Sequence, residues 1–216
     1  MKNKITTVIL DFGGVLYDID FQAAVHAFNR LGIDNFDTLY SKAVQSNLFE
    51  HFERGRITVP DFCDEIRRYF GQNRITNEEI TDAWNQLLIG YKKSRLDFVE
   101  DLKSKYTVIL LSNTNEVHYT YFTQQYLSEF QTHEPLEALF HRTFFSHRIG
   151  MRKPDAEFYR YALNQMKINP REAVFIDDTP HNLQPASELG IHAIHHNSEQ
   201  EIDAVFKGYL RGCDSK

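Results

Sequence analysis

The 216-residue chain is poor in cysteine, proline and tryptophan and has no long apolar run. Its two cysteines, Cys63 and Cys213, lie far apart, which argues against a disulfide framework or a cysteine-rich metal site. The apolar stretch near the N-terminus, residues 8–10, stops at Asp11, far short of the ~20 residues that cross a bilayer. We therefore expect a cytoplasmic protein with reduced thiols, no targeting segment and no membrane partner.

The chain also lacks an excess of positive charge. It has 24 Lys and Arg residues against 30 Asp and Glu, so its formal net charge is −6. This balance argues against a nucleic-acid partner, although it allows a local basic pocket for a small anion. The hydrophobic content of 42% and charged content of 25% are typical of a globular protein and exclude a disordered one.

Short apolar runs indicate the strands of a buried sheet. They cover residues 5–10, 106–111, 142–145, 173–176 and 191–194. The first, second and fourth runs are continuous rather than alternating, which is typical of parallel strands buried on both faces. Helical spacing follows two of the later runs, at residues 155–166 and 180–189. This order predicts an α/β fold with a doubly wound, Rossmann-like, mainly parallel sheet.

The first crossover is far longer than the dozen or so residues that a parallel connection requires. Helical spacing fills most of it, and a capping box is expected at Thr76 and Glu79. The expected helices span residues 21–31, 37–43, 59–70, 77–89 and 95–103. We therefore predict an all-helical cap at residues 17–93, inserted into an α/β core formed by residues 1–16 and 94–216.

Polar residues follow the expected strands where ligands bind in such sheets. Asp11 follows the first strand, Ser112 the second, and Asp177 and Asp178 the fourth, while Lys153 precedes a helix. Three carboxylates that converge need a cation, and their hard oxygens suit Mg²⁺. The serine, the amides after it and the lysine offer donors to an anion. This set favours phosphoryl transfer through an aspartyl-phosphate.

Four motifs in order give the chain a family resemblance. They read Ile9-Leu10-Asp11-Phe12-Gly13-Gly14-Val15, Leu110-Leu111-Ser112-Asn113-Thr114, Gly150-Met151-Arg152-Lys153-Pro154-Asp155 and Phe175-Ile176-Asp177-Asp178 with Asn182. With these motifs and a cap after the first strand, nearly the whole chain resembles the haloacid dehalogenase superfamily. The second and third motifs are similar to those of bacterial sugar-phosphate phosphatases of the α-D-glucose-1-phosphate phosphatase type.

The resemblance implies a nucleophile and a set of metal ligands. Asp11 is expected to be the nucleophile and a magnesium ligand, and Gly13 to add its backbone carbonyl. Asp177 and Asp178 are expected to hold the metal directly or through water.

The resemblance also implies a phosphate site. Ser112 and the backbone of Asn113 are expected to hold the phosphoryl oxygens, and Lys153 to neutralise charge on the nucleophile and the phosphoryl group. The expected function is a magnesium-dependent phosphatase whose partner is a small phosphorylated metabolite, such as a sugar phosphate. The sequence leaves the exact substrate and the oligomeric state open.

One position departs from the family pattern. Phosphatases of this family usually have a second Asp two residues after the nucleophile, as the general acid, and this chain has Gly13 there. General acid catalysis contributes typically about 10²–10⁴-fold. Two alternatives therefore stay open, a 2-haloacid dehalogenase-type hydrolase and a non-catalytic phosphometabolite-binding protein. The first has no need of the paired Asp177 and Asp178.

Several residues of the insert remain candidates for other roles. Residues 50–55 are expected to form a loop between two cap helices, and Glu53 and Arg54 are candidates there for contact with the substrate. Asp18 and Asp20, at the start of the insert, are candidate capping or hinge residues. They are also the nearest substitutes in sequence for the missing acid.

Histidines and one arginine are expected at the surface. His192, His195 and His196 cluster near the last strand without a recognisable zinc spacing, so we interpret them as exposed and titrating. Arg152, next to the lysine of the third motif, is expected to be a surface residue.

Overall fold

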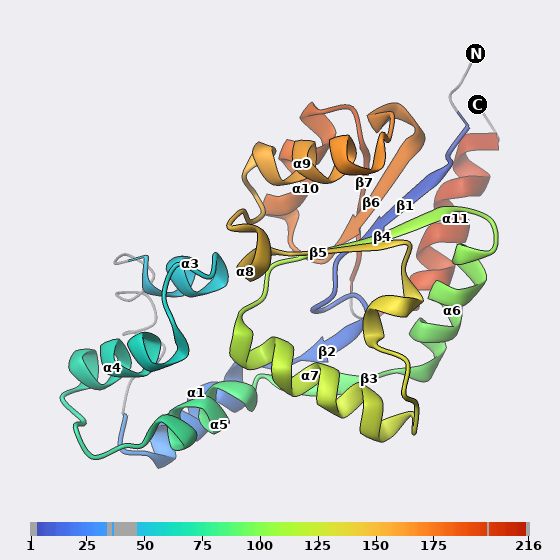
Figure 1. The fold of residues 1–216 in the computed structure, drawn as a ribbon. Helices are drawn as coiled ribbons and strands as arrows, with labels where there is room; N and C mark the ends of the chain where they lie inside the picture. Colours follow the sequence, from blue (N-terminus) through green and yellow to red (C-terminus); the bar gives the residue numbers. More distant parts are fainter. Residues whose placement is uncertain (1–3, 34–35, 37–46, 198, 215–216) are drawn as a thin grey trace.

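The computed structural model describes residues 4–33, 36, 47–197 and 199–214 (Figure 1). Within them, five parallel strands form a sheet in the order β5-β4-β1-β6-β7. The strands are β1 (Thr7–Leu10), β4 (Thr107–Ser112), β5 (Arg142–Phe145), β6 (Ala173–Asp177) and β7 (His192–His195). The predicted doubly wound α/β fold is thereby confirmed.

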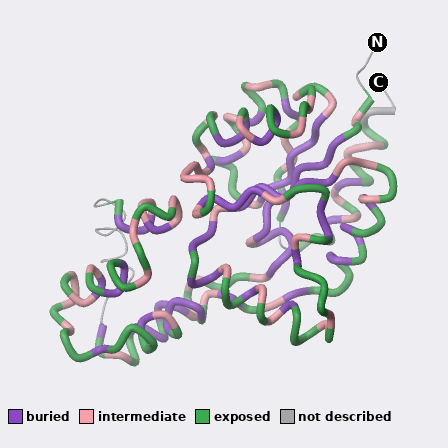
Figure 2. Tube along the Cα trace, viewed as in Figure 1, coloured by how far each residue is buried: buried purple, intermediate pink, exposed green. Residues whose placement is uncertain are grey.

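The first strand lies in the middle of the sheet. Leu10 is in register with Leu110 of β4 on one side and with Ile176 of β6 on the other. The three strands therefore end at the same level, and the residues that follow them emerge side by side. Figure 2 shows the strands as the most continuously buried part of the chain. This explains why their sequences are continuous apolar runs.

Helices cover both faces of the sheet (Figure 1). One face packs on α6 (Lys93–Lys103), α7 (Glu116–Glu129) and α11 (Ile202–Asp214), and the other on α9 (Ala156–Met166) and α10 (Pro180–Glu188). Short helical turns complete the core at α8 (Ser146–Ile149), η1 (Leu136–Leu139) and η2 (Pro170–Glu172). No helix among the described segments has the length and apolar character to span a bilayer.

The long first crossover contains a second, smaller core. Its helices are α1 (Phe21–Arg30), α3 (Leu48–Glu53), α4 (Val59–Phe70) and α5 (Asn77–Asn85). Aromatic side chains such as Phe28, Phe62 and Trp84 are buried together there. A capping box opens α4 at Thr58, and the expected one opens α5 at Thr76. The helix expected at residues 37–43 lies outside the described residues.

The insert is not all-helical, and this part of the prediction was wrong. Strands β2 (Tyr17–Ile19) and β3 (Leu88–Tyr91) pair antiparallel where the insert leaves and rejoins the core. The helix expected at 77–89 ends at Asn85, and residues 88–91 pair with β2 instead. The expected loop at 50–55 is also wrong in its first four residues, since α3 runs to Glu53.

Candidate active site

Three carboxylates meet at the carboxyl edge of the sheet. Asp11 follows β1, and Asp177 ends β6 with Asp178 directly after it. Oxygen atoms of the three side chains lie within 4.8 Å of one another. The structure therefore brings together the acidic residues that the sequence analysis placed at separate strand ends.

A buried lysine lies between two of these carboxylates. Lys153 Nζ is 2.7 Å from Asp11 Oδ1 and 2.7 Å from Asp177 Oδ2, and the side chain is 1% exposed. Asn113 fixes the backbone of the lysine, because its amide group accepts from Lys153 N–H and donates to Lys153 O, both at 2.9 Å. The Asn113 side chain therefore has a positioning role that the sequence did not reveal.

Burial makes the charges of this cluster interdependent. Burial raises the pKa of Asp11 well above its usual value, against the opposing effect of Lys153, and the charges of Asp177 and Asp178 raise it further. The pKa of Asp178 is also raised, first by burial and then by Asp177. Burial lowers the pKa of Lys153, but the two carboxylates outweigh it, so the pKa lies above its usual value. The lysine alone does not balance three acids, and a further cation would.

The donor set suits magnesium. Carboxylate oxygens are hard ligands, and Mg²⁺ is usually held by one or two of them together with water and substrate phosphate. Gly14 makes room for one ligand, because a Cβ atom there would lie 2.1 Å from Asp178 Oδ2, and its φ of +73° suits glycine. The backbone turn after β1 therefore cradles the Asp178 carboxylate.

The two acids of the fourth motif differ in how they are held. Asp177 Oδ1 accepts from Thr179 N–H at 2.7 Å and from Asn182 Nδ2 at 3.1 Å. Asp177 Oδ2 also accepts from Asn182 Nδ2, at 3.1 Å, and from Lys153 Nζ. Both oxygens of Asp177 are thus already hydrogen-bonded, whereas Asp178 Oδ1 accepts a longer hydrogen bond of 3.2 Å from the Thr179 hydroxyl.

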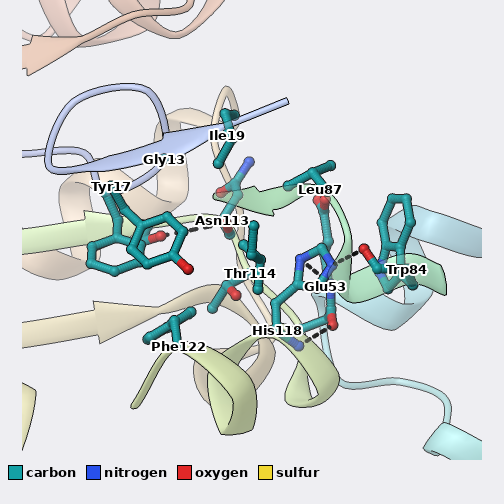
Figure 3. Close-up of a pocket in the computed structure, with 14 residues that line it drawn as sticks. Gly13, Tyr17, Ile19, Glu53, Trp84, Leu87, Asn113, Thr114, His118 and Phe122 are labelled. Carbon is teal, nitrogen blue, oxygen red and sulfur yellow. Dashed lines mark hydrogen bonds between the residues drawn. The ribbon is translucent and has the colours of Figure 1, made fainter. Parts of the chain in front are cut away.

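A cavity of about 180 Å³ opens beside this cluster (Figure 3). Gly13, Ser112 and Asn113 line it from the core, and Glu53 and Trp84 line it from the insert. Ser112 is buried, and its hydroxyl makes one long contact of 3.4 Å with the Asn113 carbonyl. Of the predicted anion-binding residues, Ser112 and Asn113 therefore line this cavity between the two parts of the chain, whereas Lys153 does not.

The end of α3 is docked onto the core next to this cavity. Glu53 Oε2 lies 3.0 Å from Arg152 Nε, and Arg54 pairs with Asp155. Arg54 also donates to the Gly150 carbonyl at 3.3 Å. Arg152 is therefore not the surface residue we expected. Its side chain is 28% exposed because it reaches up to the insert.

The histidine prediction was wrong for one of three residues. His192 and His195 are exposed, but His196 is 1% exposed. Its backbone N–H donates to Asp177 O, so His196 continues the pairing of β7 with the end of β6. Burial lowers the pKa of His196, with the charge of Arg95 next in effect.

The acids at the start of the insert are both engaged. Asp20 caps α1 by accepting from Gln22 N–H at 2.9 Å, which agrees with its interpretation as a capping residue. Asp18 pairs with Arg95 at 2.8 Å and with Lys92 at 3.2 Å. Neither lines the cavity.

Sequence reasoning missed a buried histidine that joins the core to the insert. His118 of α7 stacks on Trp84 of α5 at 4.8 Å, and its Nε2 is 3.2 Å from the Trp84 carbonyl (Figure 3). Its Nδ1 lies 3.3 Å from Asn115 Nδ2. Because Nε2 faces a carbonyl, it is the donor and Nδ1 is the acceptor. Asn115, which caps α7 and follows the second motif, was the available signal for this helix.

The fold and this cluster define a hydrolase class, and a comparison with protein families agrees. The profile of the haloacid dehalogenase-like hydrolase family matches residues 5–190. The chain belongs to this family and is an enzyme of the hydrolase class.

Several relatives are similar over most of their length. The chain is 31% identical over 187 residues to the D-ribitol-5-phosphate phosphatase of Bacteroides thetaiotaomicron. The aligned region covers 86% of this chain and 89% of that protein. A haloacid dehalogenase family enzyme of the same bacterium, solved with magnesium and inorganic phosphate, matches with a TM-score of 0.82 and 30% identity over 94% of this chain and 99% of that one. A HAD-like hydrolase of Porphyromonas gingivalis matches with a TM-score of 0.85 and 25% identity, over 96% and 98%.

Proposed function

We propose that the protein is a magnesium-dependent phosphatase that hydrolyses a small sugar or polyol phosphate through an aspartyl-phosphate on Asp11. The observation that carries this proposal is the buried ammonium of Lys153 between Asp11 and Asp177, beside a third carboxylate and a cavity. The similarity to a D-ribitol-5-phosphate phosphatase supports the substrate class. We place the enzyme in the cytoplasm, with a small metabolite and not a nucleic acid as its partner.

The metal site follows from the state of each acid. Asp11, Asp178 and the backbone carbonyl of Gly13 would hold Mg²⁺ directly. Asp177 would act through water, because both of its oxygens already accept hydrogen bonds. Bound magnesium would neutralise negative charge on the phosphoryl oxygens.

Asp11 is held in place for an attack on phosphorus. Its Oδ1 accepts from Phe12 N–H at 2.7 Å and also contacts Lys153, which leaves Oδ2 for the new bond. In the first step Oδ2 bonds to phosphorus while the bond from phosphorus to the alcohol oxygen breaks. Water then attacks the phosphorus, and the Asp11 carboxylate is released.

The remaining motif residues would hold the phosphoryl group. The hydroxyl of Ser112 and the backbone N–H of Asn113 would donate to its oxygens, and Lys153 would balance its charge. Residues 17–93 would form a cap over residues 1–16 and 94–216, and would exclude bulk water from the cavity.

The test is phosphate release from a panel of sugar and polyol phosphates, with Mg²⁺ and with a chelator. We expect turnover that requires Mg²⁺ and that falls to background in Asp11→Asn. Asp97→Asn is the matched control, because Asp97 is exposed on α6 and pairs with Lys93. Activity retained in Asp11→Asn would contradict the mechanism, and halide release from 2-haloacids without metal would support the dehalogenase alternative instead.

A further inference from the structure

Neither steric crowding nor the backbone conformation requires a glycine at position 13. A Cβ atom on Gly13 would meet only Ile19, at 3.6 Å, and Gly13 is not among the glycines with positive φ. The site thus has room for a side chain and yet has none there. If the proposed function holds, the leaving alcohol oxygen must take its proton from another group.

The cavity that Gly13 lines contains one carboxyl group among its described lining residues, that of Glu53 (Figure 3). The two other titratable side chains that line the cavity already make hydrogen bonds to protein groups. Tyr17 OH donates to Gln125, and the His118 ring is held between Asn115 and the Trp84 carbonyl. Glu53 is therefore the titratable lining residue with a side-chain oxygen, Oε2, that makes no hydrogen bond within the described part of the chain.

The Glu53 carboxylate forms an ion pair with Arg152 but no hydrogen bond with it. Its Oε2 is 3.0 Å from Arg152 Nε, but neither atom makes a hydrogen bond within the described part of the chain. Burial raises the pKa of Glu53, the charges of Arg152, Lys153 and Arg54 oppose this, and Glu50 adds to it, with a net rise. A phosphate dianion entering the cavity adds negative charge and favours the protonated carboxyl further.

We propose that Glu53 is the general acid of this phosphatase and takes the place of the side chain that Gly13 lacks. This inference rests on the proposed function. As Asp11 bonds to phosphorus, the carboxyl proton of Glu53 passes to the departing oxygen, which leaves as the alcohol. The new Glu53 carboxylate is then balanced by Arg152. In the second step it takes a proton from the attacking water, so the enzyme returns to its starting state with inorganic phosphate as the product.

The leaving-group dependence of Glu53→Gln tests this role. We compare kcat/KM, which reports the formation of the aspartyl-phosphate and not its hydrolysis, on a polyol phosphate and on substituted phenyl phosphates of increasing phenol acidity, all with Mg²⁺. The rates in this comparison are these kcat/KM values. The polyol rate should fall by about 10²–10⁴-fold. The rate on 4-nitrophenyl phosphate, whose leaving group needs no proton, should change little. A role in binding or packing would instead lower all rates by a similar factor.

Glu50→Gln is the matched control, because Glu50 lies on the same helix and pairs with Arg54 but does not line the cavity. Its effect should not depend on the leaving group. A loss in Glu53→Gln that is equal for all esters, or no loss at all, would overturn the proposal. A wild-type protein that released no phosphate from any ester would overturn the proposed function and this inference with it. Circular dichroism and the Tm of Glu53→Gln distinguish a local effect from misfolding.

Discussion

At the residue scale, the site depends on side chains that hold other side chains. Asn113 fixes Lys153 through two hydrogen bonds, and Asn182 donates to both oxygens of Asp177. Such contacts fix the lysine and the acid before substrate binds, which is how an active site lowers the cost of organising charge during the reaction.

The buried His118 gives the stability of the protein a pH dependence. Burial lowers its pKa from 6.5 to about 4. Between pH 6.5 and pH 4 the unfolded chain therefore binds a proton at this histidine that the folded chain does not bind. Stability therefore falls as the pH falls through this window, by about 3 kcal/mol in total. Urea unfolding at pH 7 and pH 4.5 should show a smaller pH effect in His118→Phe than in wild type.

The comparison of wild type with His118→Phe isolates the contribution of the His118 ring. His147, whose pKa burial also lowers to about 4, is present in both proteins and contributes equally. Equal pH effects in the two proteins would show that His118 is not the source.

Gly14 should set the magnesium affinity. In Gly14→Ala the new methyl group collides with the Asp178 carboxylate, so we expect weaker Mg²⁺ binding by calorimetric titration. Gly71→Ala is the control, because Gly71 has a similar φ of +64° and no neighbour within 4 Å. Both variants should lose stability on the order of 1 kcal/mol from backbone strain. Equal Mg²⁺ affinity in both would contradict the cradle at Gly14.

The site residues were predictable from the sequence to different degrees. Asp11, Asp177 and Asp178 were found because each follows a buried apolar strand, and strand ends in a parallel sheet converge. Arg152 and His196 were misplaced because their burial depends on contacts with distant segments. The proposed role of Glu53 depends on the position of α3 over the core, and the local sequence does not specify how the insert packs on the core.

At the scale of elements, the same limit explains the errors in the insert. The start of α5 was predicted because a capping box marks it, whereas the capping box that opens α4 became evident only in the structure. The strand β3 was missed because its four residues directly follow a helix and pair with β2, which lies about 70 residues earlier.

The end of α3 should be intolerant of a larger residue at Gly55. A Cβ atom there would lie 2.1 Å from the His147 carbonyl of α8, and the φ is +62°. Gly55→Ala should therefore lift α3 from the core, separate Glu53 from Arg152, and lower both kcat and stability, the latter by at least about 1 kcal/mol.

Gly32→Ala serves as the reference for Gly55→Ala. Gly32 also lies in the insert with a positive φ of +78°, but its Cβ would have only Gln72 as a neighbour, at 3.6 Å. Strain without displacement should reduce its stability and leave kcat unchanged. Normal kcat in Gly55→Ala would show that docking of α3 does not control the site.

At the scale of the whole molecule, magnesium should stabilise the folded protein. A ligand at 100 times its Kd adds about 2.7 kcal/mol, which for a chain of this size raises Tm by roughly 5–10 °C. The chelated protein should lose this gain, and Asp178→Asn should show no magnesium-dependent shift. A full shift in Asp178→Asn would remove this residue from the metal site.

The pairing of β2 with β3 has a consequence for the exchange of parts between proteins. Tyr17 is in register with Tyr91, so the two ends of the inserted segment leave the core as neighbours. A segment with adjacent ends can be cut out and replaced by another of different length without moving the strand ends that carry Asp11 and Asp177. Under the proposed function, exchange of the inserted segment would therefore replace Glu53 and the cavity wall that the insert supplies, while Asp11 and Asp177 keep their places.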